Sequence, residues 1–153
     1  MKKLFVVMLF LTFSLAVFPQ EKKMAAGLGL EWNMNSRHNF AGGAVLGFDF
    51  NLPRFFALGL TATGSTNFFG FNSIEGTALL RYYFLRKGYT GFFGQADAGI
   101  FVFFEDGDVT PMPEFGLRGG YRLPLGTLFY LEPYGRLGYP FAFGIGLMAG
   151  IYF

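Results

Sequence analysis

The clearest pattern in the chain is an alternation of apolar and small residues along its last stretch, Phe141–Phe153. The odd-numbered positions are all apolar, whereas the even-numbered ones are mostly small or amphipathic: Ala142, Gly144, Gly146, Met148, Gly150 and Tyr152. A period of two places alternate side chains on opposite faces of an extended strand. This segment is therefore predicted to be a β-strand with one apolar face.

The same period of two recurs along the whole chain after the first twenty or so residues. It defines eight segments: Met24–Met34, Phe40–Leu52, Phe56–Ala62, Ile74–Phe84, Phe92–Phe104, Phe115–Leu123, Phe129–Tyr139 and Phe141–Phe153. Short stretches of turn-forming or polar residues separate them, among them Ser36–Asn39, Pro53–Arg54, Thr66–Phe71, Arg86–Gly88, Glu105–Asp108 and Pro124–Gly126. Pro133 lies inside the seventh segment and predicts a bulge or a local break there, because proline cannot donate to a strand ladder. Eight alternating segments of about ten residues have the length and spacing of membrane-spanning strands.

One face of each segment is apolar, and the other is small or polar. The second face carries nine charged residues: Glu31, Asp49, Glu75, Arg81, Asp97, Arg118, Arg122, Glu132 and Arg136. We interpret them as a charge network inside a barrel, because an unpaired buried charge is costly. Catalysis by paired carboxylates is the alternative interpretation. The inward positions of the last segment and of the first three are mainly small, whereas those of segments four to seven are large, so the large half can pack across a narrow interior onto the small half.

The composition indicates that these segments lie in a membrane. The chain is 52% hydrophobic and only 14% charged, and Lys87 is the one lysine after Lys23. A water-soluble barrel needs a charged exterior, which this chain has few residues to build. No later stretch supplies 18 uninterrupted apolar residues, so a membrane protein with this sequence must span the bilayer as a closed barrel.

The aromatic residue at Phe153, preceded by apolar residues at alternate positions (Ile151, Ala149 and Leu147), resembles the C-terminal signature of outer-membrane β-barrel proteins. The length resembles the small eight-stranded barrels of the OmpA transmembrane-domain and OmpX type. This resemblance implies an all-β, eight-stranded, antiparallel, up-and-down transmembrane barrel over residues 24–153. It also implies contact with outer-membrane lipid and recognition of this set of alternate residues by the barrel-assembly machinery. We expect a monomer, and the sequence identifies no extracellular partner.

Residues 1–20 have the sequence features of a secretory signal peptide, with Lys2 and Lys3 before the apolar run Leu4–Phe18. The run is shorter than a spanning helix needs, which favours a removed signal over a retained membrane anchor. We therefore expect export through the general secretion pathway and a final location in the outer membrane.

Candidate chemistry is sparse. Cysteine is absent, so no thiolate site or disulfide is possible. His38 is the single histidine, and Ser36 two residues before it suggests a lipid-active enzyme as one alternative, although an exposed loop histidine is the simpler interpretation. The acidic loop Glu105–Asp108 lacks the spaced ligands of a dedicated calcium site. The sequence predicts no cofactor, no metal site and no nucleic-acid partner.

These observations favour a structural or interaction protein of the outer membrane with a filled lumen. The alternatives are a lipid-active outer-membrane enzyme and a narrow channel for a small solute. A secreted, soluble ligand-binding barrel of the lipocalin kind has a similar length and strand number. It is disfavoured because its apolar positions would have to face inward and its exterior would be rich in glycine.

Overall fold

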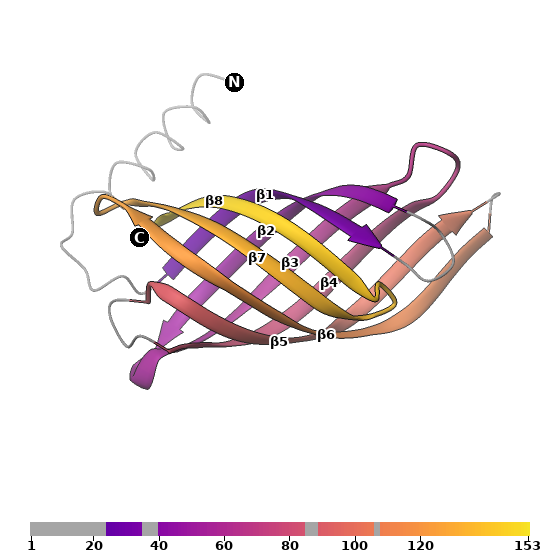
Figure 1. Ribbon diagram of the computed structural model, residues 1–153. Coiled ribbons are helices and arrows are strands. Elements are labelled where there is room, and N and C mark those ends of the chain that lie inside the picture. Colours follow the sequence, from indigo (N-terminus) through magenta and orange to yellow (C-terminus); the bar gives the residue numbers. More distant parts are fainter. Residues whose placement is uncertain (1–23, 35–39, 85–88, 106–107) are drawn as a thin grey trace, which may run out of the picture.

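The computed structural model describes residues 24–34, 40–84, 89–105 and 108–153, which form a single closed β-barrel (Figure 1). The strands are β1 (Met24–Met34), β2 (Phe40–Leu52), β3 (Phe56–Thr66), β4 (Asn72–Tyr83), β5 (Gly91–Glu105), β6 (Asp108–Leu125), β7 (Phe129–Tyr139) and β8 (Phe143–Tyr152). A short 3-10 turn, Pro53–Phe55, joins β2 to β3. Among the described residues, no helix is long and apolar enough to cross a bilayer.

Each strand pairs antiparallel with the next one in sequence, and β8 pairs with β1 to close the barrel. Leu28, for example, lies between Leu46 of β2 and Ala149 of β8. Beyond β8, the backbones of Met24 and Phe153 exchange two hydrogen bonds, each with an N···O distance of 3.0 Å. Closure leaves no unpaired sheet edge, which is the condition for placing a sheet in lipid. The predicted fold class, an eight-stranded up-and-down barrel, is confirmed.

The predicted facing of the strands also matches the structure. Leu46 in β2 is 58% exposed on the outside, whereas Asp49 on the inner face is 3% exposed. The same alternation of exposed and buried positions runs through β3, β4 and β8. The described residues therefore form a barrel that is apolar outside and polar inside.

The two ends of the barrel differ. One end carries the beginning of β1 and the C-terminus, and we call it the terminal end (Figure 1). At the opposite end the β5–β6 hairpin extends beyond the other strands, so we call it the hairpin end. The predicted signal peptide (residues 1–20) and the predicted turns 36–39 and 86–88 lie outside the described residues.

Three sequence predictions need correction, and the largest concerns β6. The strand begins at Asp108 rather than at Phe115, so part of the predicted acidic loop belongs to strands β5 and β6. Pro111 and Pro113 obscured this part of the strand, because both interrupt a normal ladder pattern. Both prolines face outward, at positions where the alternation continues unchanged.

The second correction concerns Phe141, which was placed on the apolar outer face of the last strand. It precedes β8, is 2% exposed, and packs inside the barrel with Phe71 and Phe101. The third concerns Met148 and Tyr152, two large inward side chains on a strand predicted to carry mainly small ones.

Pro133 produces a local break and no bulge. The β6–β7 pairing lapses opposite Pro133 and Glu132 and resumes at Leu123 and Leu131. The register is the same on both sides of the gap, so no extra residue is inserted.

Candidate functional site in the barrel lumen

The described part of the lumen holds ten buried charged side chains. The structure places all nine predicted charges there and adds a tenth, Glu114 on the newly defined part of β6. They form two clusters, which we call the balanced cluster (Asp49, Arg81, Arg122 and Glu132) and the acid-rich cluster (Glu31, Glu75, Asp97, Glu114, Arg118 and Arg136).

In the balanced cluster, each guanidinium contacts both carboxylates. Arg81 donates two parallel hydrogen bonds of 2.9 and 3.0 Å to the carboxylate of Glu132. Its Nη1 also lies 3.2 Å from Asp49 Oδ2. Arg122 donates to Asp49 Oδ2 at 2.6 Å and through Nε to Glu132 Oε2. Two-pronged bonds of this kind are among the stronger charge-assisted contacts. Two positive and two negative groups therefore neutralise each other in four ion pairs.

Aromatic rings cover the balanced cluster. The guanidinium carbon of Arg81 lies 4.1 Å from the ring centre of Phe93, and that of Arg122 lies 4.2 Å from the ring centre of Tyr130. Both distances are well within the range for cation–π attraction. Gln95 accepts from Arg81 and donates to Asp97 at 2.6 Å, so its amide links the balanced cluster to the acid-rich one.

In the acid-rich cluster, one guanidinium serves three carboxylates. Arg136 Nη1 donates to Glu31 Oε1 and to Glu75 Oε1, each at 2.7 Å, and Nη2 donates to Glu114 Oε1 at 2.6 Å. Glu31 also accepts from Tyr134 Oη and from Asn33 Nδ2, each at 2.7 Å.

Arg118 is the second cation of this cluster, and its contacts are looser. Its nitrogens lie 3.2 Å from Asp97, 3.5 Å from Glu31 and 3.8 Å from Glu75. Its Nε and Nη2 make no hydrogen bond. The guanidinium carbon lies 5.2 Å from the ring centre of Tyr134, so that ring forms one wall of its surroundings.

Small residues on one side of the lumen make room for these large side chains. A Cβ atom at Gly146 would lie 2.5 Å from Tyr134 Oη, and one at Gly144 would lie 2.9 Å from Arg136 Cγ. Neither position can hold a larger residue unless the side chain opposite moves. Large side chains of β7 therefore occupy the space left by glycines on the neighbouring strand β8.

Aromatic residues lie on both sides of the charged layers along the lumen. At the hairpin end, Phe71 and Phe101 pack against Phe141, with ring centres 6.4 and 5.3 Å from it. At the terminal end, Tyr130 packs on Tyr152 with ring centres 5.1 Å apart. Described aromatic side chains thus lie at both ends of the two charge clusters.

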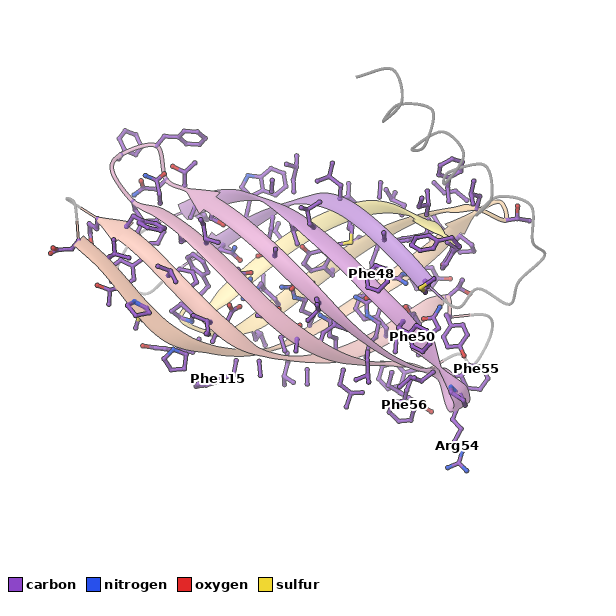
Figure 2. All side chains as sticks on the ribbon, turned by 180° about the vertical axis from the view of Figure 1, so that it is seen from behind. Phe48, Phe50, Arg54, Phe55, Phe56 and Phe115 are labelled. Carbon is purple, nitrogen blue, oxygen red and sulfur yellow. The ribbon has the colours of Figure 1, made fainter. Side chains whose placement is uncertain are left out.

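The outer wall has the opposite character. Large apolar side chains are exposed on every strand, among them Leu30, Leu46, Leu60, Leu80, Ile100, Leu117, Leu137 and Ile145. Aromatic pairs lie on the wall as well, such as Phe56 with Tyr82 and Phe115 with Tyr139. Figure 2 shows Phe48, Phe50 and Phe56 on the wall near the end from which Arg54 projects. A soluble, lipocalin-like barrel would need this arrangement reversed.

The residues of the predicted assembly signal lie on this outer face. Leu147, Ala149 and Ile151 all point outward from β8, and the ring centre of Phe153 lies 6.2 Å from that of Phe48 on β2. They form an apolar row along β8, beside the seam where β8 pairs with β1.

Among the described residues, no group of three or more His, Cys, Asp or Glu side chains has the arrangement of a metal site. Ser36 and His38, on which the enzymatic alternative depended, lie outside the described residues.

Among the solved structures that share this fold are the two that follow. The chain superimposes on the crystal structure of neisserial surface protein A (NspA) with a TM-score of 0.63 and 12% sequence identity, covering 84% of this chain and 94% of that one. It superimposes on the N-terminal β-barrel domain of OprF from Pseudomonas aeruginosa with a TM-score of 0.54 and 13% identity, covering 84% and 97% respectively. No family model matches the chain, and no curated protein matches it. The likeness predicted from sequence, to small eight-stranded bacterial barrels, is therefore confirmed for the fold.

Proposed function

We propose that this protein is an integral β-barrel of the bacterial outer membrane that acts as a structural or interaction element, with a lumen closed by its own side chains. The observation that carries the proposal is the inverted polarity of the barrel. Leu46 and Leu80 are 58% and 47% exposed on the wall, whereas Arg81 and Arg122 are 3% and 0% exposed inside. Water would penalise this arrangement, and a bilayer favours it.

The shared fold supports the location in the outer membrane. A closed barrel has no free sheet edge to be exposed to lipid, and aromatic side chains on its wall suit the two membrane interfaces. Export through the general secretion pathway after removal of residues 1–20 and insertion by the barrel-assembly machinery through Phe153 belong to the same proposal.

The filled lumen favours a structural or interaction role over transport. Aromatic layers lie at both ends of the charged clusters, and the eight strands leave an interior that side chains can fill. We further propose that the protein is a monomer, since the barrel closes within one chain and has no strand edge with which to pair.

A substitution on the wall tests the proposal. Leu46→Arg places a charge on the outer face of β2 and should lower the free energy of unfolding from lipid bilayers by about 2 to 4 kcal/mol if that face meets lipid. Leu46→Ala is the matched control and should cost much less. The parent protein should remain in the membrane pellet after alkaline carbonate extraction and should migrate faster on a gel when it is not heated.

The opposite results would overturn the proposal. A soluble barrel would leave the pellet on carbonate extraction, and Leu46→Arg would then be neutral or would raise its solubility.

A further inference from the structure

The turn between β3 and β4, residues 67–71, carries two phenylalanine side chains that have little contact with the described chain. Phe68 and Phe69 are 85% and 93% exposed, more than any other large apolar residue that the structure describes. Figure 1 shows this turn at the hairpin end of the barrel. An apolar ring left in water loses the free energy of its burial, so an exposed pair of rings indicates a contact outside the chain.

The turn has a defined conformation, so the exposure of the two rings is a fixed feature. Asn67 Oδ1 accepts hydrogen bonds from the backbone N–H groups of Phe69 and Phe71, at 2.8 and 3.0 Å. Thr66 Oγ1 accepts from the backbone N–H of Phe68 at 3.1 Å. The ring of Phe71 packs inside the barrel and anchors the turn from that side. The turn is therefore held at its base while its two exposed rings project away from the core.

The backbone of Phe68 gives a second reason to look outside the chain. Its φ of 62° lies in the left-handed region, which a bulky residue rarely adopts. Glycine or asparagine adopts this conformation more easily. A phenylalanine here brings no advantage to the backbone and almost none to packing within the described chain. Residues held in such conformations are concentrated at sites that contact a partner or ligand.

The outer wall beside the turn lacks aromatic side chains. One row of paired, outward-facing residues crosses seven strands near the hairpin end, from β8 through β1 to β6: Ile145, Trp32, Gly42, Thr66, Asn72, Phe104 and Val109. The indole of Trp32 lies beside Gly42, since a Cβ atom there would be 3.8 Å from it. Thr66 and Asn72 therefore form a gap between the aromatic residues Trp32 and Phe104, and this gap falls on the two strands that the turn joins.

The charge pattern separates this turn from the other connection at the hairpin end. Residues 55–74, which include the turn, contain no charged side chain. The β5–β6 hairpin, by contrast, carries Glu105 and Asp108 at the ends of its strands. Charged side chains suit a connection that stands in water. Aromatic rings beside uncharged polar groups suit the boundary between lipid headgroups and acyl chains.

We propose that the turn 67–71 is a lipid anchor, in which Phe68 and Phe69 enter the boundary between headgroups and acyl chains of the lipid leaflet at the hairpin end. The two rings complete the aromatic belt of the wall over β3 and β4. Lipid is favoured over an apolar pocket of a partner protein, because the rings continue the belt at the position where it is interrupted. The inference rests on the proposed location of the barrel in a membrane.

Fluorescence quenching by brominated lipids tests this, because Trp32 is the single tryptophan. Trp32→Phe combined with Phe69→Trp moves the tryptophan to the turn, and Trp32→Phe with Phe68→Trp is a second reporter. Each barrel is refolded into phosphatidylcholine vesicles with bromine near either the headgroup end or the methyl end of the acyl chains. Both variants should lose more fluorescence to bromine near the headgroup end, and their emission should shift to shorter wavelength than in the urea-unfolded protein.

Two further proteins serve as controls. The parent, with Trp32 on the wall, reports whether the barrel is in the bilayer. Trp32→Phe with Glu105→Trp moves the tryptophan to the tip of the β5–β6 hairpin, where acrylamide in the water should quench it more strongly than either brominated lipid. Heat-modifiable mobility on a gel checks that each variant is folded.

The outcomes separate this inference from the proposed function. Quenching by brominated lipid in the parent but in neither turn variant would overturn the lipid anchor and leave the membrane location intact. Strong acrylamide quenching of those variants would then favour a partner protein in the surrounding water as the occupant. Stronger quenching from the methyl end would also contradict the anchor, since it would place the rings near the bilayer centre. No quenching by either lipid in the folded parent would overturn the membrane location itself.

Discussion

The two charge clusters of the lumen are built from the same residue types, yet their arginines and carboxylates pair in different ways. In the balanced cluster, Arg81 and Arg122 each contact both Asp49 and Glu132. In the acid-rich cluster, Arg136 alone bonds three carboxylates, and Arg118 makes only looser ion pairs. In the balanced cluster, every charged group therefore has two oppositely charged partners. In the acid-rich cluster, three of the four carboxylates share the hydrogen bonds of Arg136.

The difference follows from the shape of the barrel. Glu114 enters the lumen because β6 starts at Asp108, further towards the hairpin end than a strand of ordinary length would. The long strand adds a carboxylate to a layer that has no additional cation. The number of carboxylates in a buried layer therefore depends on strand length as well as on local sequence. One part of the lumen has equal numbers of cations and carboxylates, and the other has four carboxylates for two cations.

The largest effect should come from the residue on which the acid-rich cluster depends. Arg136→Met would leave the four carboxylates of this cluster with Arg118 as their one cation and would remove the ion pair of Glu114, at an expected cost of about 3 to 5 kcal/mol in the free energy of unfolding. Arg122→Met should cost less, because Asp49 and Glu132 both keep Arg81 as a partner. Reversible urea unfolding in bilayers measures both variants. Equal losses, or a larger one for Arg122→Met, would contradict the distinction between the clusters.

Within the acid-rich cluster, Arg118 should matter less than Arg136. Its ion pairs are 3.2 to 3.8 Å long, and two of its nitrogens make no hydrogen bond. Arg118→Ala should therefore lower the refolding stability by about 1 to 3 kcal/mol. Arg118→Lys, which keeps the charge, should recover part of that loss under the same conditions. A variant as stable as the parent would show that these ion pairs contribute nothing.

Neutralising one carboxylate should have a different effect on the free energy of unfolding in each cluster. Asp49→Asn removes half of the negative charge from the balanced cluster and should cost about 1.5 to 3 kcal/mol. Asp97→Asn removes charge from a cluster that already has an excess, so we expect a change of no more than about 1 kcal/mol. Chemical unfolding of the two variants side by side checks this, and a larger loss for Asp97→Asn would argue against an excess of negative charge.

The smallest effect on stability should come from the end of the chain. Phe153 lies on the wall against Phe48 and belongs to neither charge cluster, so its deletion should change the free energy of unfolding by no more than about 1 kcal/mol. The same deletion should strongly reduce the amount of heat-modifiable barrel in the outer membrane of cells, because Phe153 is the proposed assembly signal. Unchanged amounts in cells would remove Phe153 from that role.

The sequence predicts the barrel well because one physical rule operates at nearly every position. Apolar residues alternate with polar ones wherever a strand separates lipid from lumen, so Leu46, Leu80, Glu31 and Arg136 could each be assigned to a face. The row of inward glycines on the last strand also predicts the space that Tyr134 and Arg136 occupy.

The parts that the sequence does not predict are those where this rule is interrupted. Pro111 and Pro113 hide the first half of β6, although the shared parity of Glu114, Gly116 and Arg118 is the signal that could have identified the missing carboxylate. Phe141 fits the alternation but precedes the strand, and its turn into the lumen depends on the space beside Phe71 and Phe101. The pairing of particular arginines with particular carboxylates depends on the stagger between strands, which alternation does not encode.

Conductance across a planar lipid bilayer tests the central claim most directly, which is that the barrel spans a membrane with a lumen closed by its own side chains. The purified, refolded parent should insert and show little or no steady conductance, because two clusters of buried charges lie in the lumen with aromatic side chains at both ends of them. Arg136→Met, which loosens the acid-rich cluster, should show more frequent brief openings. Large, stable single-channel steps from the parent would contradict the filled lumen and would identify the protein as a pore.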